Sequence, residues 1–226
     1  MTDPAPPAPA ATDLTLVIGN KAYSSWSLRP WLALKHTGRP FREILVPLRR
    51  PDSRARILEH SPSGRVPCLK DGGRVIWDSL AICEYLAERF PDAALWPGDA
   101  EARALARAVS AEMHSGFAAL RTHMSMDLKA AHPGEGRTPE TEADIARIAA
   151  LWRGMRERFG QGGDFLFGRF SIADAMYAPV VTRFVTYGVA LDAVGQAYVE
   201  AVQALPAMRE WTAAALAEPS EIAAAP

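Results

Sequence analysis

The chain has 226 residues, and its 25 Lys and Arg nearly cancel its 26 Asp and Glu, so the net charge of -1 gives no general attraction to nucleic acid or an anionic membrane. No apolar run approaches the ~20 residues of a membrane-spanning helix. Residues 1–13 are rich in Pro and Ala and lack the features of a signal peptide. We therefore expect a disordered tail, a cytoplasmic protein, and a chain long enough for two domains.

The first half of the chain alternates between strand and helix patterns. Short runs rich in β-branched residues predict buried strands, a turn at residues 71–73 joins the last two of them into a hairpin, and apolar residues at helical spacing predict helices. This order favours a small mixed sheet with helices on both faces, over residues 14–90. The expected strands span residues 14–19, 41–48, 66–69 and 74–76, and the expected helices run up to residue 35 and over residues 78–90.

The sequence pattern changes after residues 91–98, whose proline and glycine residues are typical of turns in a linker. Beyond the linker the pattern is all-helical, so we expect residues 99–226 to form a second, helical domain. Ser171 followed by Asp174 predicts a capping box, which is a folding device. The expected helices span residues 99–128, 138–159, 171–187, 196–205 and 206–217.

A cluster of serines stands between the first strand and the first helix, in the segment Tyr23 to Pro30. Hydroxyls ahead of a helix are ordinary N-caps. Because Pro30 should lie within the first four helical positions, we expect the N-cap at Trp26 or Ser27. A hydroxyl at a helix N-terminus can also hold an anion such as a thiolate. Capping and anion binding both remain open on this segment alone.

The order of elements and the motifs resemble the glutathione transferase superfamily over residues 14–217, nearest the zeta, or maleylacetoacetate isomerase-like, class. Ser24-Ser25-Trp26-Ser27-Leu28-Arg29 resembles the Ser-Ser-Cys-x-x-Arg signature of that class, with Trp26 in place of its cysteine. The resemblance implies a thioredoxin-like α/β domain followed by an all-α domain. It also implies glutathione as cosubstrate, with Ser24 as first choice and Ser25 as second choice for the residue that activates its thiolate.

Two further segments carry glutathione-binding roles by the same resemblance. Val66 and Pro67 match a cis-proline turn whose valine backbone pairs with the cysteinyl part of glutathione, and Arg65 is a candidate partner for the glycyl carboxylate. Asp78 and Ser79 match the acidic residue and serine that hold the γ-glutamyl end. Without the resemblance, Pro67 is interpreted as a proline at the start of an edge strand, and Asp78 is interpreted as the N-cap of a helix.

The electrophile is expected between the serine cluster and the helical domain. Candidate pocket residues are His114, Phe117, Arg121 and Arg183, and the seven-residue spacing of His114 and Arg121 predicts one helix face. Arg183 stands about three residues before the position of a substrate-binding arginine in zeta relatives. An arginine in the pocket would favour anionic substrates. Surface positions are an equal alternative for each of these residues.

The sequence therefore predicts an enzyme that adds the glutathione thiolate to an electrophilic small molecule. The alternatives are a glutathione-dependent isomerase of the maleylacetoacetate type, a glutathione-dependent peroxidase or disulfide reductase, and a non-catalytic binding module. The resemblance implies a homodimer, and neither a metal nor a nucleic-acid or membrane partner is expected. Cys68 and Cys83 are expected in the core, without a catalytic role.

Overall fold

The computed structural model describes residues 14–219, so the expected tail over residues 1–13 lies outside the described residues. A four-stranded sheet in the order β2-β1-β3-β4 forms the first part of the structure. β1 pairs in parallel with β2 and antiparallel with β3, which in turn pairs antiparallel with β4. The predicted mixed sheet and hairpin are confirmed. The strands are β1 (Leu14–Ile18), β2 (Arg42–Leu45), β3 (Cys68–Asp71) and β4 (Arg74–Ile76).

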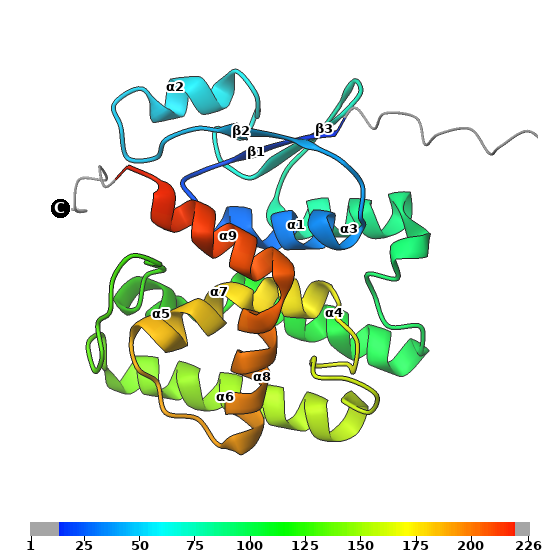
Figure 1. Ribbon diagram of the computed structural model, residues 1–226, viewed down its shortest axis with the longest axis vertical. Helices are drawn as coiled ribbons and strands as arrows, with labels where there is room; N and C mark the ends of the chain where they lie inside the picture. Colours follow the sequence, from blue (N-terminus) through cyan, green and yellow to red (C-terminus); the bar gives the residue numbers. More distant parts are fainter. Residues whose placement is uncertain (1–13, 220–226) are drawn as a thin grey trace, which may run out of the picture.

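Helices cover both faces of this sheet, as Figure 1 shows. Leu16 and Ile18 of β1 pack with α1 (Ser25–His36) and α3 (Ser79–Arg89), whereas Val17 packs with Ile57 of α2 (Ser53–Leu58). Successive residues of a strand point to opposite faces, which is why the fully buried β1 serves both layers. The sequence pattern missed α2, because this helix is short and buries only Ser53 and Ile57.

The second part of the structure is helical, as predicted, and is organised around α7. Every residue of α7 except Val185 is buried, and α7 packs against both α1 and α4. The predicted capping box is present at its start, because Asp174 accepts from the Ser171 N–H at 2.8 Å. The helices are α4 (Ala100–Ser115), α5 (Ala118–His123), α6 (Pro139–Phe159), α7 (Ile172–Thr186), α8 (Ala193–Ala204) and α9 (Pro206–Ala217).

The single helix predicted over residues 99–128 is wrong, because the chain breaks at Gly116 and Phe117. Phe117 adopts a left-handed conformation, with φ of 56°. A Cβ on Gly116 would lie 2.7 Å from the carbonyl oxygen of Glu112, so this close approach requires glycine. The break redirects α5 onto α6, where the Leu120 N–H donates to the Asp144 carboxylate at 2.9 Å.

One apolar cluster extends from β1, α1 and α3 to the helices of the second part. The short 3-10 helix Pro91–Ala93 lies within the expected linker, and the division at residues 91–98 stays a prediction. Among the described residues, no helix is long and apolar enough to cross a membrane.

Candidate functional site

The serine cluster forms the turn that starts α1, with Ser24 at the N-cap position. The Ser24 carbonyl accepts from the N–H groups of Ser27 at 3.1 Å and Leu28 at 3.2 Å, which closes the first helical turn. The N-cap predicted at Trp26 or Ser27 is therefore wrong by two or three residues, and Pro30 lies inside the helix. Helix N-termini are the least certain part of a sequence pattern.

The Ser24 hydroxyl is part of a buried hydrogen-bond chain. The Gly19 N–H donates to the Ser27 Oγ at 3.1 Å, and the Ser27 and Ser24 hydroxyl oxygens lie 2.7 Å apart. When the Ser27 hydroxyl donates a hydrogen bond to the Ser24 oxygen, the Ser24 O–H group can donate to a further acceptor. The Ser25 hydroxyl makes no hydrogen bond within residues 14–219. The structure thus places Ser24, rather than Ser25, at the end of a hydrogen-bond chain.

The sheet register brings the other two motifs to the same edge as the serine turn. Val17 pairs with Cys68, so the chain that enters β3 through Val66 and Pro67 lies at the end of β1 that leads to the serine turn. Leu69 pairs with Ile76, so the chain that leaves β4 toward Asp78 lies at this same end of the sheet. The three motifs, far apart in sequence, therefore meet beyond one end of the sheet.

The Val66–Pro67 peptide bond is cis, as the resemblance implies. Val66 precedes β3, and neither its N–H nor its carbonyl has a hydrogen-bond partner in the described part of the chain. An extended peptide can pair with such a free backbone as an added strand does. The Arg65 side chain is exposed and makes no ion pair within residues 14–219, so it is available to a ligand carboxylate at this edge.

Asp78 and Ser79 begin α3. The Asp78 Oδ1 accepts from the Leu80 N–H at 2.8 Å and the Ala81 N–H at 3.3 Å, so the N-cap interpretation is confirmed. Its Oδ2 lies 3.1 Å from the His114 Nε2. The Ser79 hydroxyl is buried and lacks a partner among the described residues. A buried hydroxyl without a partner is costly, and a ligand carboxylate would remove that cost.

Two of the four expected pocket residues, His114 and Arg121, lie together beside Trp26, whereas Phe117 and Arg183 are buried. His114 lies in the last turn of α4 beside Asp78, and Arg121 lies on α5, so their expected position on one helix face is wrong. Arg121 still reaches back to donate to the His114 carbonyl at 3.1 Å. Phe117 is buried in the apolar core. Arg183 is buried and donates to the carbonyls of Met124 at 2.9 Å and Pro179 at 3.0 Å.

An arginine that belongs to the motif Ser24 to Arg29, but to which the sequence argument gave no role, lies close to the serine turn. Arg29 of α1 is fully buried, and its guanidinium carbon lies 4.2 Å from the Trp26 ring centre. Its three nitrogens find no acceptor in the described part of the chain. Burial first, and then the charges of Arg183 and Arg121, lower the pKa of Arg29 to about 9. Its place at the end of the Ser24 to Arg29 motif was the sequence signal for it.

Trp26 lies at the centre of a cluster of basic side chains that contains Arg29, Arg121 and His114. The Arg121 guanidinium carbon lies 5.6 Å from its ring centre, and the His114 ring meets it edge-on at 5.3 Å. Burial and the charge of Arg121 also lower the pKa of Arg183, to about 10. Positive charge is therefore concentrated where the two parts of the structure meet at the N-terminus of α1.

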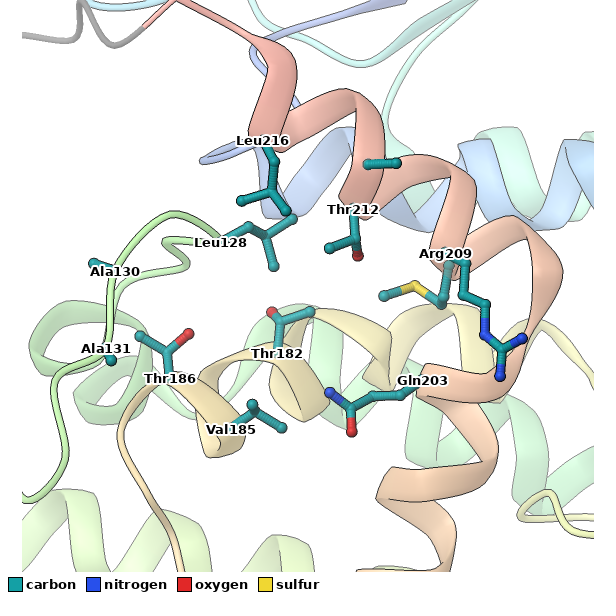
Figure 2. A pocket seen from close by; sticks show the side chains of 12 residues that line it. Leu128, Ala130, Ala131, Thr182, Val185, Thr186, Gln203, Arg209, Thr212 and Leu216 are labelled. Carbon is teal, nitrogen blue, oxygen red and sulfur yellow. The ribbon is translucent and has the colours of Figure 1, made fainter.

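A pocket of about 480 Å³ opens between α7, α9 and the segment over residues 128–131 (Figure 2). Leu128 and Leu216 point toward each other across one end, and Gln203 and Arg209 lie at the other end. The Leu128 N–H donates to the Ala22 carbonyl at 3.1 Å, so the leucine end adjoins the segment that leads to Ser24. The sequence argument missed this pocket, which uses the face of α7 that carries Thr182, Val185 and Thr186.

Two family models match most of this chain. A family model for the N-terminal domain of glutathione S-transferases matches residues 23–89, and a model for their C-terminal domain matches residues 138–214. The maleylacetoacetate isomerase of Pseudomonas aeruginosa is 30% identical over 182 residues, which cover 76% of this chain and 82% of that protein. A probable maleylacetoacetate isomerase of Caenorhabditis elegans is 30% identical over 158 residues, 68% of this chain and 73% of that protein.

Solved structures share the whole fold. A Burkholderia glutathione transferase homologue with bound glutathione is 25% identical, with a TM-score of 0.69 over 90% of this chain and 97% of that one. A zeta-class maleyl pyruvate isomerase has the same fold, with 23% identity and a TM-score of 0.70 over 92% of this chain and 100% of that one. The domain matches and the relatives together identify this chain as a member of the glutathione transferase family.

Proposed function

We propose that this protein binds glutathione, stabilises its thiolate with the Ser24 hydroxyl, and directs the sulfur to an uncharged, mainly apolar electrophile. The observation that carries the proposal is the chain of hydrogen bonds from Gly19 through Ser27 to Ser24. Because Ser27 can satisfy the Ser24 oxygen, the Ser24 proton remains for a ligand at the N-terminus of α1.

The energies of these groups suffice for the task. An ordinary thiol has a pKa of ~8.5, and lowering it by about two units requires about 2.7 kcal/mol. One hydrogen bond to a charged acceptor contributes about 1.5–3 kcal/mol. The dipole of α1 adds about 0.3–1 kcal/mol. The buried, unpaired charge of Arg29 acts in the same direction, since a nearby cation favours the ionised form of a thiol.

The residues at the sheet edge fit the tripeptide. The free backbone of Val66 suits the cysteinyl unit, the exposed Arg65 suits the glycyl carboxylate, and Asp78 can accept from the γ-glutamyl ammonium. The buried Ser79 hydroxyl, which has no partner within residues 14–219, suits the γ-glutamyl carboxylate.

The pocket under α9 supports an uncharged electrophile. Its walls are mainly apolar side chains and threonines, and Arg209, the one charged residue that lines it among the described residues, lies at the end away from the serine turn. Arg183, the residue expected to bind an anionic substrate, donates to protein carbonyls and is buried. A bulky Val185→Trp change at this half-exposed lining position should lower kcat/KM for an aryl chloride without weakening glutathione binding.

An isomerase acting on a carboxylated substrate is the second candidate. Two relatives carry the name maleylacetoacetate isomerase, and Arg29 and Arg121 concentrate positive charge around Trp26. A comparison of neutral and carboxylated electrophiles of equal size separates the two candidates. Faster turnover of the carboxylated compound, with loss of that preference in Arg121→Gln, would favour the isomerase.

The decisive measurement is a pH titration of the thiolate absorbance of bound glutathione. We expect wild-type protein and Ser25→Ala to hold the thiol pKa about two units below ~8.5, and Ser24→Ala to lose most of that shift. Binding of S-methylglutathione, which has no thiol, should be equal in all three proteins. A wild-type thiol with an ordinary pKa would refute the proposed activation, and loss of the shift in Ser25→Ala alone would refute the choice of serine.

We also propose a homodimer, in which the first domain of one subunit packs against the second domain of the other. Val75 of β4 and Trp77 ahead of α3 are large apolar side chains that are 40% and 47% exposed in the single chain, which supports a partner on this side of the sheet. Light scattering after gel filtration should give twice the mass of 24.5 kDa. A monomer at micromolar concentration would refute this arrangement.

A further inference from the structure

The segment that joins β1 to the serine turn is held by the far end of the chain. The Lys21 N–H donates to the Glu218 Oε1 at 2.7 Å, and the Ala22 N–H donates to the Glu218 Oε2 at 3.2 Å. Glu218 follows the last residue of α9 directly. Figure 1 shows this end of α9 beside the segment that leaves β1. One carboxylate thus occupies two successive backbone donors just ahead of Ser24.

The carbonyls of the same two residues are also bonded from the second half of the chain. The Trp211 indole N–H donates to the Lys21 carbonyl at 2.9 Å, and the Leu128 N–H donates to the Ala22 carbonyl at 3.1 Å. Segments outside helices and strands must find partners elsewhere for their backbone groups. Here every backbone polar group of Lys21 and Ala22 has such a partner, and two of the four come from Glu218.

The position of this segment decides where Ser24 lies. The N–H groups of Tyr23 and Ser24 both donate to the Asn20 carbonyl, at 3.2 and 2.8 Å, so residues 20–24 form one closed turn. A shift of Lys21 or Ala22 therefore moves Ser24 relative to Ser27. The bond between their hydroxyls, which leaves the Ser24 proton available, depends on that placement. Lys129 in turn donates to the Glu218 carbonyl and fixes this residue at the end of α9.

We propose that Glu218 is a positioning residue for thiolate activation: its carboxylate clamps the backbone of Lys21 and Ala22 and so holds the Ser24 hydroxyl in its donating position. This inference rests on the proposed function of Ser24. Glu218 does not touch the ligand-binding residues Val66, Asp78 and Ser79. Loss of the Glu218 carboxylate should therefore change the ionisation of the bound glutathione thiol without changing the affinity for the tripeptide.

The negative charge of Glu218 and its hydrogen bonds to the backbone should shift the pKa of the bound thiol in opposite directions, and this difference makes the proposal testable. A carboxylate near a thiolate disfavours the thiolate, so neutralising it would lower the thiol pKa if charge were its whole effect. Losing the clamp removes the Ser24 donation and raises the thiol pKa. Asp127 and Glu218 already raise the pKa of the neighbouring Tyr23, after burial, so the charge does reach this turn.

The test compares Glu218→Gln with the control Glu210→Gln in the titration of bound glutathione. Gln is of equal size and keeps one acceptor, but its amide group cannot accept from the second backbone N–H. Glu210 is on the same helix and pairs with Lys35 at 2.7 Å, away from the serine turn. We expect the thiol pKa to rise by about one unit in Glu218→Gln, a tenfold change in ionisation, and to stay within about 0.2 units of wild type in Glu210→Gln.

Two further measurements keep the result decisive. S-methylglutathione should bind Glu218→Gln within about twofold of wild type, which shows an intact, folded site. Trp211→Phe keeps a smaller aromatic side chain but removes the indole N–H that bonds the Lys21 carbonyl, so it should also raise the thiol pKa. If the thiol pKa is depressed in wild type but is unchanged or lower still in Glu218→Gln, the proposed role of Glu218 is refuted. An ordinary thiol pKa in wild type overturns the proposed function itself.

Discussion

The buried hydroxyl of Ser79 should make opposite contributions to stability and to glutathione binding. Ser79 is 1% exposed, and its hydroxyl oxygen lacks a partner among the described residues. A buried, unsatisfied hydroxyl costs about 1–3 kcal/mol. Ser79 is also the first residue of α3, where alanine is well tolerated because Asp78 supplies the cap. Ser79→Ala should therefore stabilise the ligand-free protein by about 1 kcal/mol, or about 2–4 °C in Tm.

The same substitution should weaken glutathione binding. A hydrogen bond from Ser79 to a carboxylate is worth about 1.5–3 kcal/mol, which corresponds to about 10- to 150-fold in Kd. Urea unfolding measures the first effect and titration calorimetry with glutathione the second. Ser110→Ala is a matched control, because that buried hydroxyl donates to the Ala106 carbonyl at 2.7 Å on α4. The control should lose stability and bind glutathione normally. A less stable Ser79→Ala protein with wild-type affinity would refute the reasoning.

Three other outcomes follow from buried groups. Ser27→Ala should raise the thiol pKa of bound glutathione by about one unit, since the Ser24 hydroxyl then loses the hydrogen-bond partner at 2.7 Å that orients it. The thiolate titration measures this shift, and an unchanged pKa would contradict the role of the Ser27 hydroxyl. Asp174→Ala should cost at least about 3 kcal/mol in urea unfolding, because four buried donors lose their acceptor; a loss below about 1 kcal/mol would contradict it. Burial raises the pKa of the Cys83 and Cys68 thiols, so each has a smaller thiolate fraction than an ordinary cysteine at the same pH. Neither should react with a chromogenic disulfide until the protein is denatured, and rapid native labelling of Cys83 would show that its helix opens.

Local chemistry in the sequence was enough to predict most elements, whereas the three motifs of the site were assigned from the resemblance to the glutathione transferase superfamily. β-branched runs, the Gly-rich hairpin turn and apolar residues at helical spacing each act over a few residues, so β1, the hairpin, α3, α6, α7 and α9 were predicted close to their observed places. The Ser171–Asp174 capping box is equally local. The helix break at Gly116 was missed, because a single glycine in a helical pattern does not by itself end the helix, and the contact of α5 with Asp144 of α6 forms only in the folded chain.

Only the tertiary structure decided which side chains act together. The sequence named Ser24 and Ser25 as neighbours, but the depth of the turn and the approach of Ser27 give one of them a hydrogen-bond chain and leave the other without one. It named Arg183 for a ligand, yet packing against the Met124 carbonyl buries that guanidinium, while Arg29 is left without an acceptor among the described residues.

The contact between Glu218 and the serine turn shows the difference most plainly. The two ends of this contact are 196 and 197 residues apart, and no spacing rule in a sequence relates a glutamate after the last helix to two backbone amides near the start. Residue types and short-range spacing indicated the helices and strands, and the resemblance of the motifs indicated a glutathione transferase with a serine at the start of α1. The long-range packing of α9 on the first domain determined how that serine is held, because backbone groups in an irregular turn take whatever partners the folded chain brings to them.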